Sequence, residues 1–559
     1  MALQVAVLTL VLVAFGSACL AGEAKGEWTV EFDGAALPSG AWHASPGQNT
    51  EMKVEDGALR ILDRGTERTQ LCFVSTGWQC EPRYGAVVEA RVKVLACSGR
   101  AGMCLLVADG VHEQCFTLYP DRIVAEDADL EAKADLAKDF RVVRVEIKET
   151  DFKLRVDGAA LLNGAGKFVK KAHEGRNVCG FGSISSPSTG DGLWDFVRYK
   201  AVAEPFQLVP GAEHIVVFKQ EGIYACFPTL YQMPDSMLAI SFGTRVTRSH
   251  IDSRGGSKQL VSRDGGKTWT DPPADLVIHN PDTRRADGKF AEAWPTGWRE
   301  APAAEREKLE ARGLEVRPVR EGIVAYCEGA HFRVRDAQRH EVAKGAIQLP
   351  PLALLMGFGR PSYLNAGNGI RLVAVYGYAT PRGVRQTWCL RTENDGDSWD
   401  FVPMASALPN TGFNETALLK TTRGAIIALM RTEPSKEHNG FLFQCESVDG
   451  GRTWSAPVNT GIWGYPCHLL QLQSGQILCA YGYRRRPMGV RAVVSRDEGK
   501  TWDAKNTFVL RADGAGNSSD LGYPQSVQLP DRTIVTAYYM NCKDNITHVA
   551  VTRWRLPAP

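Results

Sequence analysis

A short motif that recurs in the second half of the chain constrains the fold more than any other feature of the sequence. It has the form S-x-D-x-G-x-T-W and begins at residues 262, 447 and 495. A fourth, degenerate copy begins at residue 392. In such a segment Asp and Ser or Thr can hydrogen-bond a tight glycine turn while Trp packs beneath it. One turn repeated in four places predicts a repetitive β-structure.

The spacing of the copies sets the size of the repeating unit. Their starts are separated by 130, 55 and 48 residues, and an interval near 50 suits one four-stranded propeller blade. The longest interval leaves room for a blade without the motif and for an insertion, in which residues 302–313 predict a short helix. The run 214–218 is expected to pair with the last blade and close the ring. Six strand groups are predicted, at residues 226–269, 321–349, 360–399, 415–454, 465–502 and 523–554.

The first part of the chain has no such repeat. Residues 86–94 and 140–147 alternate or are rich in β-branched side chains, which predicts a β-sandwich over residues 26–203. Segments 140–147 and 152–158 predict a hairpin, and 193–197 a last strand. The region resembles the concanavalin-like jelly-roll domains often attached to secreted glycosidases, which serve as sugar binders or as spacers. We therefore expect an all-β chain, a jelly-roll sandwich followed by a six-bladed β-propeller at residues 210–559.

Composition limits the partners. The 65 basic side chains nearly balance the 63 acidic ones, with a net charge of +2. Nothing in this balance indicates binding to nucleic acid or to an anionic lipid surface, which clustered basic residues usually mark. The sequence has no CxxC pair, zinc-type Cys/His cluster or phosphate-binding glycine loop, so no metal and no other cofactor is expected. Six cysteines between residues 25 and 200 would be free to form disulfides after export, and their pairing stays open.

The chain begins with an uncharged apolar stretch at residues 3–21. It predicts a secretory signal peptide over residues 1–24, with small residues as cleavage points. We expect the mature chain to be secreted or periplasmic, without stable insertion in a membrane; a short membrane anchor is the alternative. Cys19 weakly resembles a bacterial lipoprotein site, but Gly16 stands where leucine is usual, so lipidation is not favoured.

The repeated motifs resemble the Asp boxes of the sialidase (neuraminidase) superfamily, over roughly residues 214–556. In that family the boxes lie on the outer turns of the blades and take no part in the chemistry, so on their own they support only the fold. The inner strands of a propeller converge on its axis. Polar residues that begin the blades can therefore contribute to one shared pocket.

Two blade starts match the family closely. Residues 414–431 resemble the blade that carries the glutamate that activates the nucleophile and the second arginine, which gives these roles to Glu415 and Arg431. Residues 522–529 resemble the last blade, which makes Tyr523 the nucleophile. A glutamate near the axis needs a hydrogen-bonding partner, and a tyrosine hydroxyl would serve. A packed aromatic residue is the alternative for Tyr523.

The first blade departs from the family pattern. Ala-Cys-Phe-Pro stands in place of Phe-Arg-Ile-Pro, so Cys226 occupies the position of the first carboxylate-binding arginine. The Phe-Gly-Thr-Arg segment that ends at Arg245 resembles the one whose arginine ends the second strand. Ser-His-Ile-Asp, which ends at Asp252, resembles the loop with the acid/base aspartate. A turn aspartate is the alternative for Asp252, and His250 is either a residue lining the site or a structural histidine.

The third arginine that the resemblance implies must come from the basic run at residues 484–486. Strand alternation puts Arg484 and Arg486 on one side and Arg485 on the other, and Arg484 is favoured. Solvated loop charges are the alternative. Arg360, which starts a blade in an Arg-Pro context, is either a replacement for the arginine lost at Cys226 or a structural residue.

Taken together, the resemblance implies a secreted exo-glycosidase that hydrolyses terminal α-linked sialic acids with retention. Arginines would bind the substrate carboxylate, and a neutral tyrosine would avoid the repulsion that an anionic nucleophile meets beside it. Sialylated or other acidic glycans are the expected partners. The alternatives are an exo-glycosidase for another ulosonic or uronic acid, which Cys226 motivates, and a non-catalytic carbohydrate-binding propeller. The presence of Asp252, Glu415 and Tyr523 together argues against the last.

Overall fold

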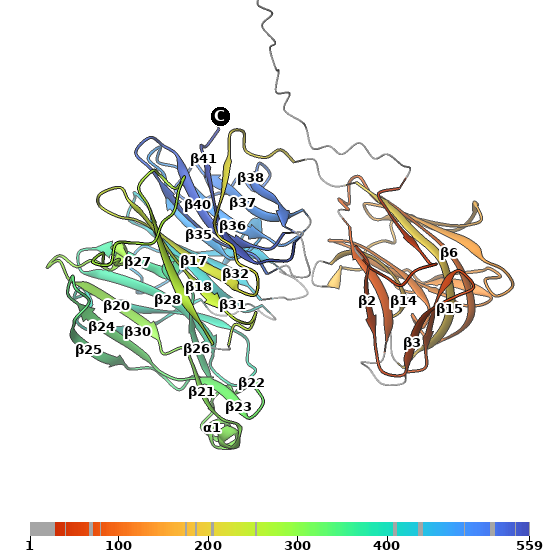
Figure 1. The fold of residues 1–559 in the computed structure, drawn as a ribbon, viewed down its shortest axis with the longest axis horizontal. Coiled ribbons are helices and arrows are strands. Elements are labelled where there is room, and N and C mark those ends of the chain that lie inside the picture. The colour runs from red at the N-terminus through yellow and green to blue at the C-terminus, as the bar shows by residue number, and fades with distance from the viewer. Residues whose placement is uncertain are drawn as a thin grey trace, which may run out of the picture. The chain divides into compact units, whose positions relative to one another are not determined.

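The computed structural model describes residues 28–39, 41–65, 71–78, 80–173, 176–184, 187–202, 206–251, 254–405, 408, 411–433, 440–485, 487–514, 520–542 and 544–557. The predicted signal peptide, Cys19, Asp252 and Arg486 lie outside these residues. Contacts divide the chain into two compact units, Met1–Lys170 with Val178–Ala203, and Lys171–Asn177 with Glu204–Pro559. Both are built of strands, so the chain is all-β as predicted (Figure 1). None of the helices in the described ranges is long and apolar enough to cross a membrane.

The first unit consists of two sheets. The larger sheet contains, in spatial order, β13 (Ala159–Gly164), β12 (Asp151–Val156), β11 (Arg141–Lys148), β6 (Ala86–Ser98), β15 (Thr189–Ala201), β4 (Ala58–Asp63) and β3 (Thr50–Glu55), with β1 (Val30–Asp33) also paired to β15. The smaller sheet contains β10 (Leu130–Lys133), β9 (Arg122–Ala125), β8 (Glu113–Leu118), β7 (Cys104–Asp109), β14 (Asn177–Ser183), β5 (Cys72–Gly77) and β2 (His43–Pro46).

One hydrophobic core joins these two sheets. Alternate side chains of a strand point to the same face, and those of both sheets meet in this core, such as Val92 of the larger sheet and Phe116 of the smaller one. The predicted hairpin is β11 and β12, in which Val145 pairs with Leu154 and both side chains enter the core.

Within the described residues, the second unit contains seven sheets. One belongs to an insertion, and six follow one another along the chain. Their strands are, first, β17 (Tyr224–Gln232), β18 (Leu238–Arg245) and β19 (Gly255–Ser262); second, β20 (Phe290–Pro295), β24 (Ala330–Arg335) and β25 (Glu341–Ile347); third, β26 (Leu354–Gly357), β27 (Tyr363–Gly367), β28 (Ile370–Tyr378), β29 (Gln386–Thr392) and β30 (Asp400–Ala405); fourth, β31 (Phe413–Lys420), β32 (Ile426–Thr432), β33 (Phe441–Ser447) and β34 (Val458–Trp463); fifth, β35 (Cys467–Gln471), β36 (Ile477–Tyr483), β37 (Met488–Ser495) and β38 (Phe508–Gly514); sixth, β39 (Gly522–Gln528), β40 (Ile534–Met540), β41 (His548–Trp554) and β16 (Glu213–Phe218).

The sixth sheet takes a strand from the start of the unit. As predicted from residues 214–218, β16 pairs with the last strand, β41, and Val216 lies opposite Ala550. Because β16 precedes the first sheet in the chain, it ties the beginning of the unit to its end. It also covers an edge that β41 would otherwise expose.

The prediction for the second group, residues 321–349, is wrong at its start. The second sheet begins at β20, whereas β23 (Ile323–Cys327) joins β21 (Trp298–Pro302) and β22 (Arg317–Arg320) in a separate sheet of the insertion. No box motif marks this sheet, so the sequence offers no signal for its first strand. The expected helix is present as α1 (Arg306–Ala311) after the 3-10 turn η3 (Ala303–Glu305); the other 3-10 turns are η2 (Pro281–Thr283) and η4 (Arg360–Ser362).

The three clear box motifs form one kind of turn. In the first, the hydroxyl of Ser262 donates a hydrogen bond to Asp264 Oδ1 (2.8 Å), and Thr268 donates to the same carboxylate through its N–H (3.0 Å) and its hydroxyl (2.6 Å). The same bonds recur at Asp449 and Asp497. A single acidic side chain thus satisfies the turn in each copy.

The degenerate copy keeps this geometry with an amide. The hydroxyl of Thr392 donates to Asn394 Oδ1 (2.8 Å), and the N–H of Ser398 donates to the same oxygen (3.0 Å). The side-chain amide of Asn394 donates to Ser398 Oγ (2.9 Å), which reverses the donor in the third bond. Asparagine therefore replaces aspartate in this turn without a carboxylate charge.

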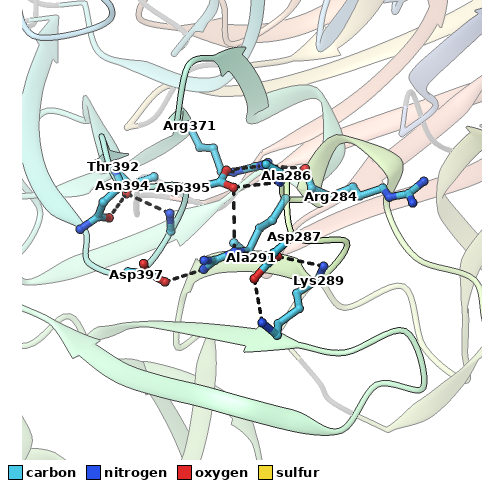
Figure 2. Close-up of polar contacts among 12 residues, drawn as sticks. Arg284, Ala286, Asp287, Lys289, Ala291, Arg371, Thr392, Asn394, Asp395 and Asp397 are labelled. Atoms are coloured by element: carbon cyan, nitrogen blue, oxygen red, sulfur yellow. Dashed lines mark hydrogen bonds and ion pairs between the residues drawn. The ribbon is translucent and has the colours of Figure 1, made fainter.

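A buried arginine fastens the degenerate box to the segment that leads into the second sheet (Figure 2). Arg371, 1% exposed, donates from Nε to Asp395 Oδ1 (2.7 Å) and from its terminal nitrogens to the carbonyls of Asp282 (2.9 Å) and Arg284 (2.6 Å). Asp395 also accepts from the N–H of Ala286 (3.0 Å). The charges of Arg371 and Asp395 are both satisfied by these hydrogen bonds. The role of this cluster is therefore to join two sheets.

Each box also carries a glycine that packs against another sheet. All four glycines have positive φ, and a Cβ added to any of them would meet a side chain there. The pairs and their distances are Gly266 and Val535 (3.3 Å), Gly396 and Ala291 (2.4 Å), Gly451 and Leu372 (2.2 Å), and Gly499 and Ile427 (2.8 Å). The third, fourth and fifth sheets thereby pack on the sheet before them, and the first sheet packs on the sixth.

Candidate active site

The first strands of several sheets in the second unit lie against one another. β17 contacts β39, β39 contacts β35, and β35 contacts β31. In β17, β31 and β39 the pairing register shifts near the start of the strand, as in a β-bulge. A bulge bends the strand and re-aims a side chain. These three bulges define where the candidate site is built.

One residue in each bulge has a left-handed backbone. The three are Phe227 (φ 52°), Glu415 (φ 22°) and Tyr523 (φ 49°). A residue other than glycine in this region costs about 1–3 kcal/mol, and such strain is concentrated at functional sites. Two of the three are the glutamate and the tyrosine that the sequence singles out.

Glu415 joins two predicted site residues. The Tyr523 hydroxyl donates to Glu415 Oε1 (2.5 Å), and Arg431 Nη1 donates to Glu415 Oε2 (2.5 Å). Both carboxylate oxygens are therefore occupied, and Glu415 itself is 8% exposed. The structure brings the predicted glutamate, tyrosine and second arginine into direct contact.

The same contacts set the protonation states. Burial alone would raise the pKa of Glu415, but the charge of Arg431 and the hydrogen bonds from Tyr523 and Arg431 outweigh it and lower the pKa. Burial and the charge of Glu415 hold the pKa of Tyr523 well above its usual range, against Arg431 and Arg484. At neutral pH the pair is a carboxylate that accepts a hydrogen bond from a neutral phenol.

Arg484 lies near the rings of two tyrosines. Its guanidinium carbon is 5.9 Å from the ring centroid of Tyr523 and 5.3 Å from that of Tyr465, over which Arg431 also lies, at 4.4 Å. Arg431 Nε and Arg484 Nη2 are buried and have no hydrogen-bond partner within the described ranges. Unpaired buried donors are costly. Two of them beside Tyr523 suit a ligand that brings anionic acceptors.

Phe227 packs into the site beside the tyrosine. Its ring lies 4.7 Å from that of Tyr523 and 5.1 Å from that of His250, and the guanidinium of Arg245 lies 5.3 Å from its centroid. Arg245 also donates to the carbonyl of Ser249 (3.0 Å). Arg245 and His250 thus belong to the same cluster as Tyr523.

Cys226 contributes no charge to the site. It is fully buried, and burial raises the pKa of its thiol to about 12. Its partner across the sheet is Gly243. A Cβ added to Gly243 would lie 3.4 Å from Cys226 Sγ and 3.7 Å from Arg245 Nε. Arg245 therefore reaches the neighbourhood of Cys226.

The structure places Arg360 elsewhere. Its Nε donates to Asp282 Oδ2 (3.0 Å) and its Nη1 donates to the carbonyl of Leu230. It lines a cavity of about 570 Å³ together with His468, which accepts a hydrogen bond from the N–H of Ser526 (3.2 Å). In the described part of the chain no hydrogen bond or ion pair joins Arg360 to Glu415 or Tyr523, although its turn, η4, contacts β31.

Asp520 belongs to the site but has no sequence signal. Its Oδ1 accepts a hydrogen bond from the hydroxyl of Tyr539 (2.5 Å), and its Oδ2 accepts one from Tyr224 and lies 3.3 Å from His250 Nε2. Asp520 follows a run of small and polar residues and resembles a loop aspartate in sequence. Only the fold brings its partners to it, since Tyr224 lies 296 positions away.

Two further properties bear on cofactors. The described residues include no group of three or more His, Cys, Asp or Glu side chains placed to hold a metal ion. None of the cysteines in the described ranges forms a disulfide.

Comparisons with known proteins agree with the repeats. A family described as BNR repeat-like domain matches residues 320–539. The solved structure of a protein of unknown function from Dyadobacter fermentans is 24% identical, covers 62% of this chain and 100% of its own, and has a TM-score of 0.51, which shows a shared fold. No curated protein matches the sequence significantly.

Two sialidase structures are also similar at a lower level. Trypanosoma rangeli sialidase in complex with the inhibitor DANA is 13% identical, with 62% of this chain and 60% of that chain covered and a TM-score of 0.41. The Hadza microbial sialidase Hz136 is 12% identical, with 92% and 99% covered and a TM-score of 0.39.

Proposed function

We propose that this chain is an exo-glycosidase of sialidase type that hydrolyses terminal α-linked sialic acids with retention of configuration. The observation that carries the proposal is the 2.5 Å hydrogen bond from the Tyr523 hydroxyl to Glu415. A sugar-binding protein has no need of a phenol paired with a buried carboxylate. A tyrosine nucleophile does, because the carboxylate takes its proton as the oxygen attacks.

The first step forms a covalent intermediate. The Tyr523 oxygen attacks the anomeric carbon, its proton passes to Glu415, and the glycosidic C–O bond breaks. Asp252, the proposed proton donor, supplies the proton that the leaving oxygen needs. Because the attacking group is a neutral phenol, the substrate carboxylate on the same carbon does not repel it.

The second step releases the sugar. Asp252 takes a proton from water, the water oxygen bonds to the anomeric carbon, and the bond to the Tyr523 oxygen breaks as Glu415 returns its proton. Two displacements at one carbon retain the configuration. Arg431 and Arg484 would bind the substrate carboxylate, and the buried Arg431 Nε and Arg484 Nη2, which make no hydrogen bond within the described residues, support this role.

The proposal extends to the architecture. We take the six sheets as the blades of a closed propeller spanning residues 210–559, with the first unit as a jelly-roll domain over residues 26–203. Packing of the first box on β40 and pairing of β16 with β41 support ring closure, since both join the first and last parts of the unit. Export through a signal peptide at residues 1–24 completes the proposal.

A second candidate is hydrolysis of another acidic sugar. The buried, neutral Cys226 favours it, because one arginine of the carboxylate-binding set is missing and Arg245 approaches from the neighbouring strand. A rearranged set of arginines suits a carboxylate held at a different angle. Other ulosonic acids and uronic acids are the sugars concerned.

The test is release of free sugar by the purified chain. Sialyl-lactose is compared with glycosides of other ulosonic acids and of uronic acids, and we expect release from the sialyl-lactose. Tyr523→Phe should lower turnover at least about 10³-fold. Tyr538→Phe is the matched control, because its buried hydroxyl bonds to Thr552 (2.7 Å) and Arg511 (2.9 Å) and not to Glu415. Binding without release from any of these glycosides would overturn the proposal.

A further inference from the structure

One carboxylate joins three sheets beside the nucleophile. Asp520 precedes β39, and four side chains converge on it: Tyr224 and His250 from the first sheet and its following loop, Tyr539 from the sixth, and Arg484 from the end of β36 in the fifth. Among the described residues alone, four groups meet this carboxylate, which is more than packing of a loop requires. The reaction proposed above uses none of these contacts.

We propose that Asp520 is a positioning residue of the candidate active site, which holds the guanidinium of Arg484 beside the ring of Tyr523. The inference rests on the proposed function, because it assigns Arg484 a part in that reaction. Asp520 is not a catalytic residue in this scheme, since it acts through the arginine.

Two consecutive residues hold Arg484. Its Nη2 lies 3.6 Å from Asp520 Oδ1, an ion pair too long for a hydrogen bond. Its Nε donates to the backbone carbonyl of Leu521 (3.1 Å). These two contacts approach the guanidinium through different nitrogens, so they restrict its rotation as well as its position. The guanidinium carbon then lies 5.9 Å from the centroid of Tyr523.

This position matters when Tyr523 loses its proton. Negative charge develops on the phenol oxygen as the proton moves to Glu415, and a fixed cation nearby stabilises that charge without reorganisation. Arg431 is already paired with Glu415. Of these two arginines, Arg484 is the one that is not paired with Glu415, the proposed base. Its orientation therefore determines how much it stabilises the phenolate.

Asp520 is suited to this task because it stays ionised. Burial would raise its pKa, but hydrogen bonds from His250, Tyr224 and Tyr539 and the charge of Arg484 hold that pKa well below the usual range. An ionised acid in a site for anionic substrates opposes their binding through its own charge. Any benefit of this acid must therefore come from the residues that it positions, and Arg484 is a cationic neighbour of Asp520 that also lies beside Tyr523.

The chain contains a matched cluster outside the site. Arg511 donates to Asp513 through Nε (2.7 Å) and Nη2 (2.6 Å), and through Nη1 to the hydroxyl of Tyr538 (2.9 Å). Tyr538 and Tyr539 are neighbours in β40, so their side chains point to opposite faces of the sheet. Asp513 thus pairs, like Asp520, with an arginine beside a tyrosine, but the tyrosine here bonds to Arg511 and is Tyr538 instead of Tyr523.

The test compares Asp520→Ala with Asp513→Ala in the full chain. We expect Asp520→Ala to lower kcat on the substrate glycoside by about 10- to 100-fold, and Asp513→Ala to change kcat by less than about twofold whatever its effect on melting temperature. Asp520→Asn, which keeps the size and removes the charge, should lower kcat in the same direction and serves if the alanine variant does not fold. An unchanged kcat, or an equal loss in Asp513→Ala, would overturn the inference.

A double-mutant cycle separates positioning from a general structural role. If Asp520 acts through Arg484, adding Asp520→Ala to Arg484→Ala should lower kcat by no more than about threefold. Multiplication of the two single effects would contradict the inference.

A crystal structure of Asp520→Ala gives a readout that does not depend on activity. The guanidinium of Arg484 should leave the ring of Tyr523, and an unmoved guanidinium would refute the positioning role whatever the substrate is. Failure of the wild-type chain to cleave any acidic glycoside would instead refute the proposed function, and the displacement of Arg484 would still decide the inference.

Discussion

The box turns and the bulges of the same sheets repeat in different ways. At the box turns the sequence itself repeats, and Asp264, Asp449 and Asp497 make the same hydrogen bonds. At the bulges only the backbone repeats, since Phe227 and Tyr523 share a left-handed conformation but no chemistry. Both features occur several times along one chain, yet only one of them is visible as a motif.

The difference follows from what each position must do. A box residue satisfies the donors of its own turn, and that task is identical in every copy. A bulge residue is turned toward a shared site, where a glutamate, a tyrosine and a phenylalanine have separate tasks. Repetition of sequence therefore marks the box ends of these sheets, and divergence on a repeated backbone marks the ends that form the candidate site.

Glu415→Gln should give the largest effect that this contrast predicts. Glutamine keeps the size of the side chain but does not take the proton of Tyr523, so we expect kcat to fall by about 10²- to 10⁴-fold with little change in melting temperature. The measurement is turnover of the glycoside that the wild type cleaves. Glu498→Gln is the control from a box, where Glu498 accepts from the N–H of Thr422 (2.9 Å). Equal turnover in Glu415→Gln and Glu498→Gln would contradict the distinction between the bulge residues and the box residues.

How far the sequence predicts the molecule depends on the same distinction. The boxes located four sheets because each turn needs fixed residue types, and the pairing of β16 with β41 followed from the need to cover an edge. The second sheet has no box, and its first strand, β20, escaped prediction. Glu415, Arg431 and Tyr523 were found because each begins or ends a recognisable strand segment, and the structure places them in contact.

The remaining site residues could not be predicted for physical reasons. None of the left-handed bulge residues is a glycine, the usual signal of that backbone, so Phe227 gave no indication of its place. Asp520 depends on Tyr224 and Tyr539, which only the folded sheets bring together. Arg360 had a plausible position in sequence, but its bonds to Asp282 and Leu230 depend on the path of the chain between β26 and β27.

Gly451→Ala should have a smaller effect, on stability alone. Gly451 has a φ of 83°, and an added Cβ would lie 2.2 Å from Leu372 Cδ2. Backbone strain and overpacking together should destabilise the second unit by about 2–4 kcal/mol. Gly424→Ala is the control, because Gly424 has a φ of 90° but nothing within 4 Å of an added Cβ, so only about 1 kcal/mol is expected. Urea denaturation of the full chain measures both. Equal losses of stability in the two variants would mean that the box glycine is not tightly packed against the neighbouring sheet. Neither variant should change the turnover of the substrate glycoside.

The smallest effect concerns acid. Burial would raise the pKa of Asp449, but hydrogen bonds from Thr453, Ser447 and the backbone lower it from 3.8 to about 2. A folded-state pKa below the unfolded one means that this aspartate stabilises the fold above pH about 4 and loses that contribution as the pH falls toward 2. Asp449→Asn should therefore cost about 1 kcal/mol or less at pH 6 and less still at pH 3, because Asn394 shows that an amide can make the turn without a charge. Asn394→Asp should do the reverse and make the degenerate box sensitive to acid. Unfolding free energies measured at pH 6 and pH 3 test both variants. If Asp449→Asn kept the full acid sensitivity of the wild type, protonation of Asp449 would not be the cause of that sensitivity.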